Sequence, residues 1–501
     1  MTESLVAPRA AATPDPRRWR ALAVCVAVLF LTLLDVTIVY VALPSIGAGI
    51  GAPASQLQWV VSGYALAFGT VPIIAGRLGD DRGRRRMLLI GVSAFVLTSA
   101  AAGLAPTAEV LIAARVLQGL AGGLLNPQVA GLVQQLFPPA ERGKAFGWIG
   151  TSVGVATACG PVLGGAVLFL GGDRLGWRLA FLINIPVGIL AILLCRRWLP
   201  ADPPPRQPRR RLDLPGAALL GLGVLGVLFP AVQYDADHDA GLAFLFLPAA
   251  AVLALFYGWE RGPARRGGHP LIDTSLFRIR SYAAGLSLAL VFFCGFSGLP
   301  LVLSLFLQQG LGYAALASGL TASAYAAGSA TAAQISGRLV SRLGRWVPVG
   351  GLSMCTLGVA GLVTVALTVP GQVPDHRVWL YLAGPLLLAG LGAGSVVTPN
   401  QALSLVDIDV RGGSTAGGML QTAQRIGSAV GVAVLSSVFY ASTTSAPATG
   451  PGRSAGYGQA YGTAAAVALG LMATALALAV YDARRASAAR RPAQVPADLA
   501  V

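Results

Sequence analysis

The chain has 501 residues, of which 55% are hydrophobic and 11% are charged. A soluble protein of this length would carry more charge and less apolar sequence, so that class is excluded and lipid is the expected solvent around most of the chain. The formal net charge of +16 does not indicate nucleic-acid binding, because the basic residues follow the membrane topology derived below.

Apolar runs of about 18 to 25 residues recur along the chain, and each can cross a hydrocarbon core of roughly 30 Å as an α-helix. Their abundant glycines suit close helix packing in lipid. Fourteen runs are predicted to span the membrane, at 20–43, 57–76, 87–105, 109–132, 146–170, 179–196, 214–233, 241–258, 282–306, 315–336, 347–369, 379–400, 414–440 and 460–481.

The basic residues support this assignment, because cytoplasmic loops of membrane proteins carry an excess of arginine and lysine. With the N-terminus in the cytoplasm, 30 of the 36 basic residues fall in cytoplasmic segments, and both termini lie inside. Lys144 is the only lysine, which favours a GC-rich bacterial genome and hence a bacterial cytoplasmic membrane. The basic residues assigned to the outer side are Arg174, Arg178, Arg377 and Arg453.

One cytoplasmic loop occurs twice, as GRLGDDRGR from Gly76 and as GRLVSRLGR from Gly337. The copies match at five of nine positions and are 261 residues apart. Eight predicted helices separate them, whereas a parallel repeat of two six-helix halves needs only six. The two surplus helices, within 214–258, are therefore predicted to be an insertion between the halves.

These boundaries predict an all-α polytopic membrane protein of two six-helix bundles plus two extra central helices. The predicted parts are a cytoplasmic tail (1–18), an N-terminal six-helix bundle (19–198), cytoplasmic linkers with two inserted transmembrane helices (199–281), a C-terminal six-helix bundle (282–483) and a second cytoplasmic tail (484–501).

Seven motifs in this order resemble those of the fourteen-helix drug:proton antiporter branch of the major facilitator superfamily. The resemblance covers nearly the whole chain. Two positions depart from it, since Tyr40 stands where asparagine is common and Asp81 where a basic residue is usual. The motifs are LDVTIVYVALP (34–44), GRLGDDRGRRR (76–86), RVLQGLAGG (115–123), GPVLGG (160–165), WRLAFLINIPVG (177–188), PLIDTSLFRIRSY (270–282) and RGGSTAGGMLQTAQRIGSAVGVA (411–433).

The resemblance implies bundles of the major facilitator type, a monomer, and export of drugs in exchange for protons. The expected partners are a small amphipathic molecule, protons and membrane lipid, with the proton gradient as energy source and no cofactor. The sequence has no G-x-x-x-x-G-K-[ST] phosphate loop, which argues against ATP-driven transport. Its five cysteines lack metal-ligand spacing, so no metal site and no enzyme is predicted.

Asp35 is the leading candidate for proton coupling, because an acidic side chain deep in a membrane is costly and usually functional. At 1.5 Å per residue it lies about 22 Å above the cytoplasmic start of its helix, and Arg115 lies about 9 Å below the outer surface. These depths agree for a core of roughly 30 Å. Asp35 and Arg115 are therefore expected to face each other, if the first and fourth helices are neighbours as the resemblance implies.

Such a pair can act as a proton switch, because a neighbouring cation favours the charged carboxylate whereas burial favours the neutral acid. The alternative is a permanently ionised pair that fixes two helices together, and Arg115 has the same two interpretations. Glu109, at the edge of its helix, is the rival proton carrier.

The repeated loop is predicted to act as a latch between the inner ends of the two halves. Its glycines allow tight turns, and Asp80 can sit at a helix terminus and pair with arginines of a neighbouring helix. Ser341 occupies the position of Asp80 in the second copy, so the latch is expected on one side only. A basic loop that serves only topology is the alternative. The residues assigned to the latch are Gly76, Asp80, Gly83, Arg84 and Arg85.

The segment around GPVLGG combines a proline, which removes a helix hydrogen bond, with glycines that permit close helix approach. It favours a bend or a tight seal at the interface of the halves, and the resemblance implies a signature of antiporters. Ordinary tight packing is the alternative. The residues concerned are Gly154, Gly160, Pro161, Gly164 and Gly165.

Arg425 is predicted near mid-membrane, where it contacts substrate, pairs with Asp35 in one state, or bonds backbone carbonyls. Aromatic side chains suit a flat or cationic substrate, although lipid-facing or core packing is an open alternative. The candidates for the substrate cavity are Tyr40, Tyr64, Gln118, Phe292, Phe296, Tyr325, Gln421 and Arg425.

The predicted function is proton-coupled export of small amphipathic or cationic drugs across the cytoplasmic membrane by alternating access. A dedicated exporter of one endogenous metabolite, such as an antibiotic made by the same cell, is the alternative. Solute uptake by proton symport is a third possibility, which the direction of transport distinguishes from export.

Overall fold

The structure is a computed structural model that describes residues 16–202, 213–237, 244–265, 274–443 and 451–489. Its described part is helical, and the only extended pairing there is an isolated bridge between Pro370 and Val373. Most of the predicted terminal tails, and much of the linkers on either side of the inserted helices, lie outside the described residues.

Seven helices form the N-terminal half: α1 (Arg18–Ile50), α2 (Ala54–Thr70), α3 (Pro72–Arg82), α4 (Arg84–Gly103), α5 (Ala108–Leu136), α6 (Pro139–Leu182) and α7 (Asn184–Trp198). The inserted segment supplies α8 (Leu214–Asp237) and α9 (Phe246–Arg265). The C-terminal half contains α10 (Arg280–Phe296), α11 (Leu299–Leu305), α12 (Ala315–Leu343), α13 (Trp346–Thr368), α14 (Val378–Ser404), α15 (Gly413–Thr443) and α16 (Pro451–Ala489). Three short 3-10 helices and one π-helix complete the described part: the 3-10 helices are η2 (Thr274–Arg278), η4 (Asp375–Arg377) and η5 (Val410–Gly412), and the π-helix is η3 (Phe306–Gly310).

Two predicted spans are bent. Helices α2 and α3 meet at an angle of 48°, and Pro72 begins α3, because a proline suits a first turn but not a helix interior. The stretches Pro139–Thr157 and Val162–Gly172 of α6 meet at 42°. Gly172 then adopts φ 60°, which ends this span, and the next span, Leu175–Trp198, begins in the last part of α6 and continues through α7.

Fewer helices meet the length and hydropathy expected of a membrane span than the fourteen that the sequence predicts. Within the described residues nine helices are long and apolar enough to cross a membrane, or up to eleven if each bent pair is one span. The other three predicted runs coincide with α8, α9 and α12, which are helical but fall short of that measure. Fourteen spans therefore stay a prediction.

Two helix boundaries also differ from the predicted ones. Helix α1 continues past Pro44 to Ile50 and ends where Gly51 takes φ 65°. Helix α16 continues to Ala489, beyond residue 483, where the C-terminal bundle was expected to end. Hydropathy alone marks the apolar core of a helix, whereas the hydrogen-bonded helix extends into the polar layers on either side.

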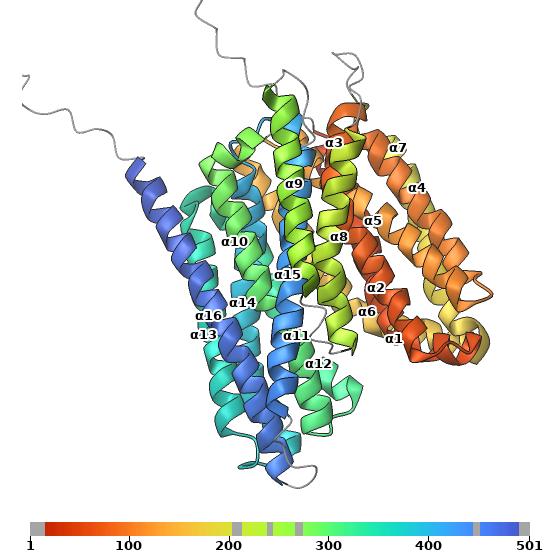
Figure 1. Cartoon of the computed structure of the whole chain (residues 1–501), viewed down its shortest axis with the longest axis vertical. Helices are drawn as coiled ribbons and strands as arrows, with labels where there is room; N and C mark the ends of the chain where they lie inside the picture. The colour runs from red at the N-terminus through yellow and green to blue at the C-terminus, as the bar shows by residue number, and fades with distance from the viewer. Residues whose placement is uncertain (1–15, 203–212, 238–243, 266–273, 444–450, 490–501) are drawn as a thin grey trace, which may run out of the picture.

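The two halves contact each other through a small set of helices. Helix α15 packs against α3 and α5, and α12 packs against α6. The inserted helices α8 and α9 lie side by side over the seam between the halves, where α8 touches α2 and α15 (Figure 1).

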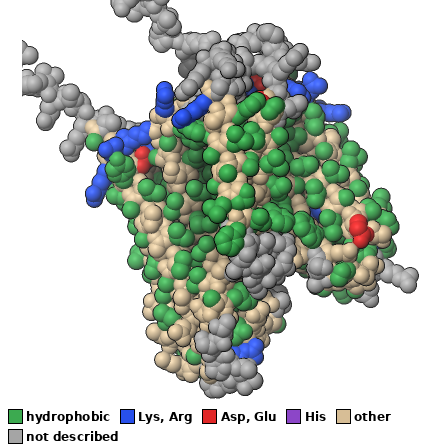
Figure 2. Space-filling view, in the orientation of Figure 1, with side chains coloured by type: hydrophobic (Ala, Val, Ile, Leu, Met, Phe, Trp, Pro, Cys, Tyr) green, Lys and Arg blue, Asp and Glu red, His purple; other side chains and the backbone are tan. Residues whose placement is uncertain are grey.

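The outer surface is apolar along the sides, and Lys and Arg side chains gather toward its upper end (Figure 2). Large hydrophobic side chains such as Leu97, Val162 and Phe169 are more than two-thirds exposed. Water would not favour such a surface, but the hydrocarbon of a bilayer does. The described part is thus an all-helical multi-pass membrane fold.

Candidate functional site

Asp35 and Arg115 form an ion pair inside the N-terminal half. The Nη1 of Arg115, on α5, lies 2.6 Å from the Oδ2 of Asp35, on α1. The two side chains are 1% and 0% exposed, respectively. Asp35 and Arg115 therefore face each other, as their similar predicted depths in the membrane led us to expect.

Three further polar side chains enclose this pair. Gln118 donates to the Oδ1 of Asp35 at 3.0 Å, and Asn184 of α7 donates to the same oxygen at 2.6 Å. Both amides also donate to the hydroxyl of Ser99 on α4, at 2.8 Å each. All three residues are fully buried. Among the described residues, the partners of the Asp35 carboxylate in this network all belong to the N-terminal half.

Arg115 has partners besides Asp35. Its Nε donates to the carbonyl of Val60 at 3.1 Å, and its Nη1 also donates to the Oε1 of Gln118 at 2.7 Å. The guanidinium lies 4.1 Å from the centre of the Tyr64 ring. A buried ion pair is costly unless its remaining donors have partners, and the Nε and Nη1 donors of Arg115 have them here.

Glu109, the rival carrier, lies apart from this network. It is in the first turn of α5, is exposed, and accepts a hydrogen bond from Gln56 at 3.0 Å. Its surroundings are those of a surface carboxylate at a helix start.

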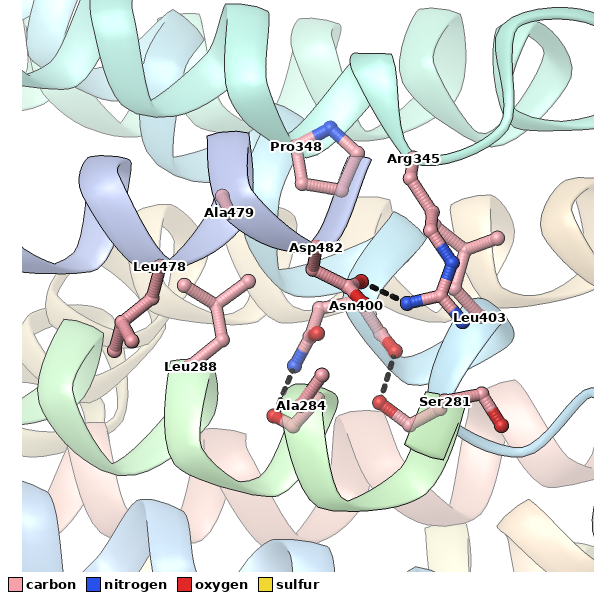
Figure 3. Close-up of a pocket in the computed structure, with 12 residues that line it drawn as sticks. Ser281, Ala284, Leu288, Arg345, Pro348, Asn400, Leu403, Leu478, Ala479 and Asp482 are labelled. Atoms are coloured by element: carbon pink, nitrogen blue, oxygen red, sulfur yellow. Dashed lines mark hydrogen bonds and ion pairs between the residues drawn. The ribbon is translucent and has the colours of Figure 1, made fainter. Parts of the chain in front are cut away.

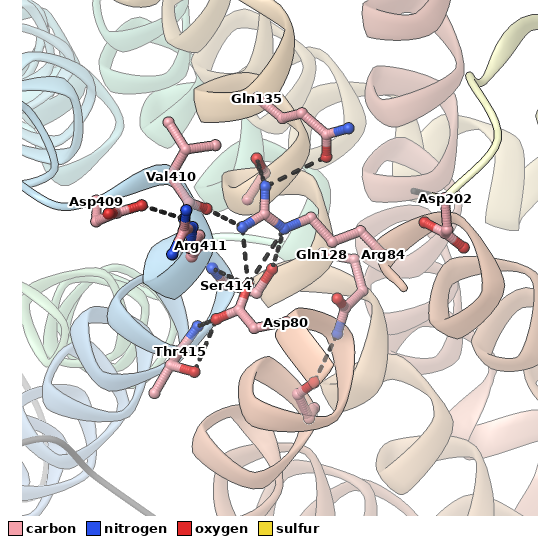
Figure 4. A network of polar contacts seen from close by, with 12 residues as sticks. Asp80, Arg84, Gln128, Gln135, Asp202, Asp409, Val410, Arg411, Ser414 and Thr415 are labelled. Carbon is pink, nitrogen blue, oxygen red and sulfur yellow. Dashed lines mark hydrogen bonds and ion pairs between the residues drawn. The ribbon is translucent and has the colours of Figure 1, made fainter. Parts of the chain in front are cut away.

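A second polar network joins the two halves (Figure 4). Asp80, near the end of α3, accepts hydrogen bonds from the backbone N–H groups of Ser414 and Thr415 at 3.1 and 2.8 Å. It also accepts from the Thr415 hydroxyl at 2.8 Å. These donors belong to the first turn of α15, so a carboxylate of one half caps a helix of the other.

Arg84, at the start of α4, completes this network. Its Nη2 lies 2.8 Å from the Oδ1 of Asp80, and its Nε donates to the hydroxyl of Ser414 at 2.9 Å. It also donates to the carbonyl of Val410, in the C-terminal half, and to that of Gly131, on α5, the latter at 2.7 Å. The ion pair itself lies within one half, so hydrogen bonds to the α15 terminus make the link, rather than an ion pair across the seam.

The other latch residues have separate contacts. A Cβ on Gly76 would collide with the backbone of Ser414, so glycine allows α3 and α15 to touch. Gly83 has φ 103°, and the carboxylate of Asp202 occupies the place of its missing Cβ. Arg85 donates its backbone N–H to Asp202 at 3.0 Å, which ties α4 to the end of the N-terminal half rather than to the other half.

The second copy of the loop makes a different contact. A Cβ on Gly337 of α12 would lie 2.5 Å from the carbonyl oxygen of Gly143 on α6. Ser341 is exposed and its hydroxyl bonds the Arg338 carbonyl of its own helix. Arg345 pairs with Asp482 of α16 beside a cavity of about 20 Å³ (Figure 3). The described residues thus give the second copy close packing across the seam without a helix-capping carboxylate.

The glycines around GPVLGG pack against two neighbours of α6. A Cβ on Gly154 would lie 2.8 Å from the Ala330 side chain of α12, in the other half. Gly160 faces Thr37 of α1, in its own half, and Gly164 faces the same helix. Gly165 has open space on its Cβ side. The bend of 42° lies between residues 157 and 162, and the side chain of Pro161, inside it, is outside the described residues.

Three candidates for the substrate cavity are buried within a bundle. Gln118 belongs to the Asp35 network, and Tyr64, 4% exposed, lies beneath Arg115. Phe292, 1% exposed, packs in the core of the C-terminal half. Residue type and helix number did not reveal which face of each helix is turned inward. These three side chains line no open surface in this conformation.

The remaining candidates lie at more open positions. Tyr40 on α1 is 56% exposed, and Phe296 stacks on Tyr325 with ring centres 5.3 Å apart. Arg425 of α15 is exposed and lies over the Phe68 ring of α2, 4.5 Å from its centre, so this contact crosses the seam. The Oε1 of Gln421, one turn earlier, has no hydrogen-bond partner among the described residues.

A family model settles the class of protein. The model of the Major Facilitator Superfamily matches residues 25–432. The chain belongs to this superfamily. The resemblance drawn from the motifs is thereby confirmed, and the protein is a transporter and not an enzyme.

Relatives of this transporter are named for antibiotic transport or for drug resistance. It is 39% identical over 434 residues to the probable actinorhodin transporter of Streptomyces coelicolor, which covers 86% of this chain and 74% of the relative. It is 33% identical over 416 residues to the multidrug resistance protein Stp of Mycobacterium tuberculosis, covering 82% and 74%.

A solved structure supports the fold of the transporter. The human organic anion transporter MFSD10 (TETRAN) superposes with a TM-score of 0.64 at 19% identity, over 93% of this chain and all of that one. At this identity the likeness concerns the fold alone.

Residues that sequence reasoning missed complete both networks of the transporter. Asn184 donates to the Asp35 carboxylate and to the hydroxyl of Ser99, and Asp202 caps the start of α4 through the N–H groups of Arg85 and Arg86. Asn184 lies within the motif 177–188, and a lone amide in that apolar run was a usable signal. No cluster of potential metal ligands occurs in the part of the chain that the structure describes.

Proposed function

We propose that the protein is a proton-coupled antiporter that exports small amphipathic or cationic drugs across the bacterial cytoplasmic membrane. It works as a monomer by alternating access and uses the proton gradient without a cofactor. In this proposal α8, α9 and α12 also cross the bilayer, which makes fourteen spans and leaves both termini in the cytoplasm. The clustering of basic side chains at one end of the bundle supports this orientation (Figure 2).

The observation that carries the proposal is the Asp35 carboxylate. It is fully buried within the helices of a membrane transporter, and its hydrogen-bond partners include Gln118 and Asn184 as well as Arg115. Hydrogen-bond donors and cations around a carboxylate favour its charged form, whereas burial without them favours the neutral acid. It can therefore exchange a proton when helix movement changes its surroundings.

Arg115 is arranged to tolerate a neutral Asp35. The carbonyl of Val60, the Oε1 of Gln118 and the face of the Tyr64 ring all remain as partners for the guanidinium. Protonation thus removes one partner and leaves the others, so the cost of a buried cation is partly offset. This supports a coupling role for the pair over a purely structural one.

Alternating access requires the halves to separate at one end at a time. The contacts of Asp80 and Arg84 with the first turn of α15 close the seam at one end in this structure. Breaking them opens that end. Tyr40, Gln421 and Arg425, at the more open positions, are the side chains we assign to substrate contact.

A dedicated exporter of one endogenous metabolite is the second candidate. It is favoured by the relative at 39% identity, which is named a probable actinorhodin transporter. The two functions share a mechanism and differ in breadth. A panel of unrelated drugs separates them, because a dedicated exporter moves one chemical class only. Proton symport is less favoured, since the relative Stp is named for multidrug resistance, and a transporter confers resistance by removing drugs from the cell.

The test is transport of cationic dyes and antibiotics in inside-out vesicles, with proton release recorded beside substrate uptake, for the native protein and Asp35→Asn. The native protein is expected to exchange protons for substrate, and the variant is expected to lose the exchange at equal expression. Glu109→Gln is the matched control and should exchange normally. Substrate movement without proton release, or normal coupling by Asp35→Asn, contradicts the proposal.

A further inference from the structure

Two arginines lie inside helices that span the membrane, and their surroundings differ. Arg115 on α5 is bonded to Asp35 and to Gln118. Arg425 lies about 18 Å along α15 from the first residue of that helix, near the middle of a core of roughly 30 Å. In the part of the chain that the structure describes, Arg425 forms neither a hydrogen bond nor an ion pair, and its guanidinium contacts the Phe68 ring. A charged side chain at this depth is costly and usually functional.

Arg425 is turned toward the other half of the molecule. Its guanidinium lies 4.5 Å from the centre of the Phe68 ring on α2, and a Cβ on Gly69 of α2 would lie 3.9 Å from its own Cβ. Leu228 of α8 lies against Gly69 as well, so α8 covers this part of the seam. Arg425 is nevertheless exposed. Because charges inside membranes face the bundle interior or a water-filled space, the exposed part of the guanidinium is open to molecules that enter between the halves.

The contact with Phe68 uses only one face of the guanidinium. A ring attracts the cation through its face, whereas the five N–H donors of arginine point outward in the plane of the group. Those donors have no acceptor among the described residues. A planar fork of this kind binds a carboxylate by two parallel hydrogen bonds, and its other face can stack on a further aromatic ring. What Arg425 lacks is therefore an anion, and an aromatic anion fits it best.

Gln421 offers a second polar group at the same place. It lies one turn before Arg425, on the same face of α15. It is half-buried, and its Oε1 has no hydrogen-bond partner within the described segments. A flip exchanges the oxygen and the nitrogen of an amide, so Gln421 can turn its NH2 donors toward the same molecule. A buried polar atom without a partner costs free energy, and a ligand that bonds this amide removes that cost.

The charges around this place also favour an anion. The Asp35 carboxylate is fully buried and is neutralised by Arg115, so this pair presents no net charge. The Phe68 ring stacks on Tyr64, which lies beneath Arg115, so aromatic side chains connect the two arginines. Over the described ranges, no carboxylate pairs with Arg425. A molecule that reaches this part of the seam therefore meets a positive charge, which attracts an anion and repels a cation.

We propose that Arg425 is a specificity-determining residue that selects aromatic molecules with a carboxylate or a similar anionic group. The anion binds the N–H groups of Arg425, the ring of the molecule stacks on the guanidinium face opposite Phe68, and the amide of Gln421 donates to a further oxygen. This inference rests on the proposed function, because it selects anions among the amphipathic substrates named there and assigns this contact to no cation. The membrane potential, negative inside, assists the outward movement of an anion.

Binding to the purified full-length protein in phosphatidylcholine nanodiscs tests the site. The probe is 2-naphthoate, which is ionised at neutral pH, and 2-naphthamide is its neutral counterpart of nearly the same shape. Arg425→Gln removes the positive charge, so it should raise the Kd of the naphthoate about tenfold and leave that of the amide unchanged. Arg425→Lys keeps the charge without the planar fork and should lose less affinity.

Arg485→Gln is the matched control. Arg485 is also exposed and lies over an aromatic ring, that of Tyr481, 4.7 Å from its centre, but it is near the C-terminal end of α16. Its replacement should leave the binding of both probes as in the native protein. A second readout needs no variant. Naphthoate should protect Arg425, and not Arg485, from modification by phenylglyoxal, as measured by peptide mass spectrometry, and the amide should protect neither.

Native affinity of Arg425→Gln for naphthoate overturns the inference. Equal loss of both probes also overturns it, since the residue then shapes the site without selecting charge, and so does tighter binding of 2-naphthylmethylammonium than of naphthoate by the native protein. Phosphatidylglycerol headgroups carry anionic oxygens as well. If adding this lipid abolishes the part of the binding that depends on Arg425, the contact belongs to a lipid headgroup and the assignment to a substrate is wrong.

These outcomes are separate from those of the vesicle experiment. Binding in nanodiscs needs no proton gradient, so the proposed function and this inference can fail independently. If cations are exchanged for protons in vesicles while Arg425→Gln binds naphthoate normally, the proposed function stands and the inference is wrong. If naphthoate binds through Arg425 but proton exchange fails with every substrate, naphthoate included, the antiport mechanism is wrong and the anion site stands.

Discussion

Two aspartates, Asp35 and Asp80, each lie beside an arginine, but they are connected to the molecule in opposite ways. The partners of Asp35 come from α5 and α7, all within the N-terminal half. Asp80 pairs with Arg84 in its own half and also caps α15 of the other half. Separation of the halves does not by itself break the first network, which changes only when helices move within the N-terminal half, whereas the second must break whenever its end of the seam opens.

The largest effect is expected from removing the cation of the internal pair. Arg115→Leu leaves the Asp35 carboxylate buried without its counter-charge, so the free energy of unfolding should fall by about 3–5 kcal/mol. The measurement is thermal unfolding of the purified protein. The double variant Asp35→Asn with Arg115→Gln removes both charges and should recover more than half of the loss.

If the single and double variants unfold alike, the pair is not what stabilises this bundle. Neither variant should open the seam, because no partner of Asp35 in this network lies in the C-terminal half.

A smaller effect, confined to the seam, is expected from Asp80→Asn. The amide cannot accept as strongly from the α15 terminus, and charge-assisted bonds of this kind contribute about 1.5–3 kcal/mol. Opening at this end should therefore become roughly tenfold or more frequent. Ala130, buried on α5 against Gly417 of α15, is the reporter position.

In a cysteine-free background, Ala130→Cys should react faster with a membrane-impermeant thiol reagent in inside-out vesicles when Asp80 is replaced. Asp81→Asn is the matched control, because Asp81 pairs with Arg77 within α3. An equal rise in both variants would show that loop charge alone, and not the cap on α15, holds this end closed.

Replacing the first glycine of each copy of the loop by alanine is expected to impair transport to a similar extent. Gly76→Ala and Gly337→Ala each place a Cβ against backbone of the opposite half, at Ser414 and Gly143. Backbone cannot move aside easily, so each contact should weaken by about 1–3 kcal/mol. Drug export should fall in both variants, and Gly165→Ala, which faces open space, should export normally. A clear difference between the first two would mean that only one side of the seam bears on transport.

The sequence predicted the pairing of charges better than the surroundings of the pair. The helix rise per residue gives the depth of Asp35 and of Arg115 in the membrane, and the agreement of the two depths predicted that they pair. Gln118 is three residues after Arg115 and therefore on the same helix face, so its contact with Arg115 could have been predicted. It was instead assigned to the substrate cavity. Ser99 and Asn184 join from α4 and α7, and no spacing along the chain predicts which faces of separate helices converge.

The same limit applies at the seam. The repeat predicted that both loops lie at equivalent places, and the absence of an acid in the second copy predicted a one-sided latch. It did not predict that Asp80 binds backbone N–H groups of α15, because backbone N–H groups are present at every helix start and do not show which distant carboxylate will bind them. Nor did the apolar runs of the sequence predict that α8, α9 and α12 fall short, by length and composition, of the measure for a membrane-spanning helix.

The smallest effect is expected from adding an acid to the second copy. Ser341→Asp restores the residue type of Asp80, but Ser341 is exposed and bonded to its own helix. A solvated surface substitution of this kind changes stability by no more than about 0.5 kcal/mol. Thiol labelling of Ala130→Cys and drug export should therefore equal those of the native protein. If Ser341→Asp instead restores closure in the Asp80→Asn background, the two sides of the seam are interchangeable. The lack of a latch at the second copy would then be due to serine at position 341, and not to the absence of a helix terminus for an acid to cap.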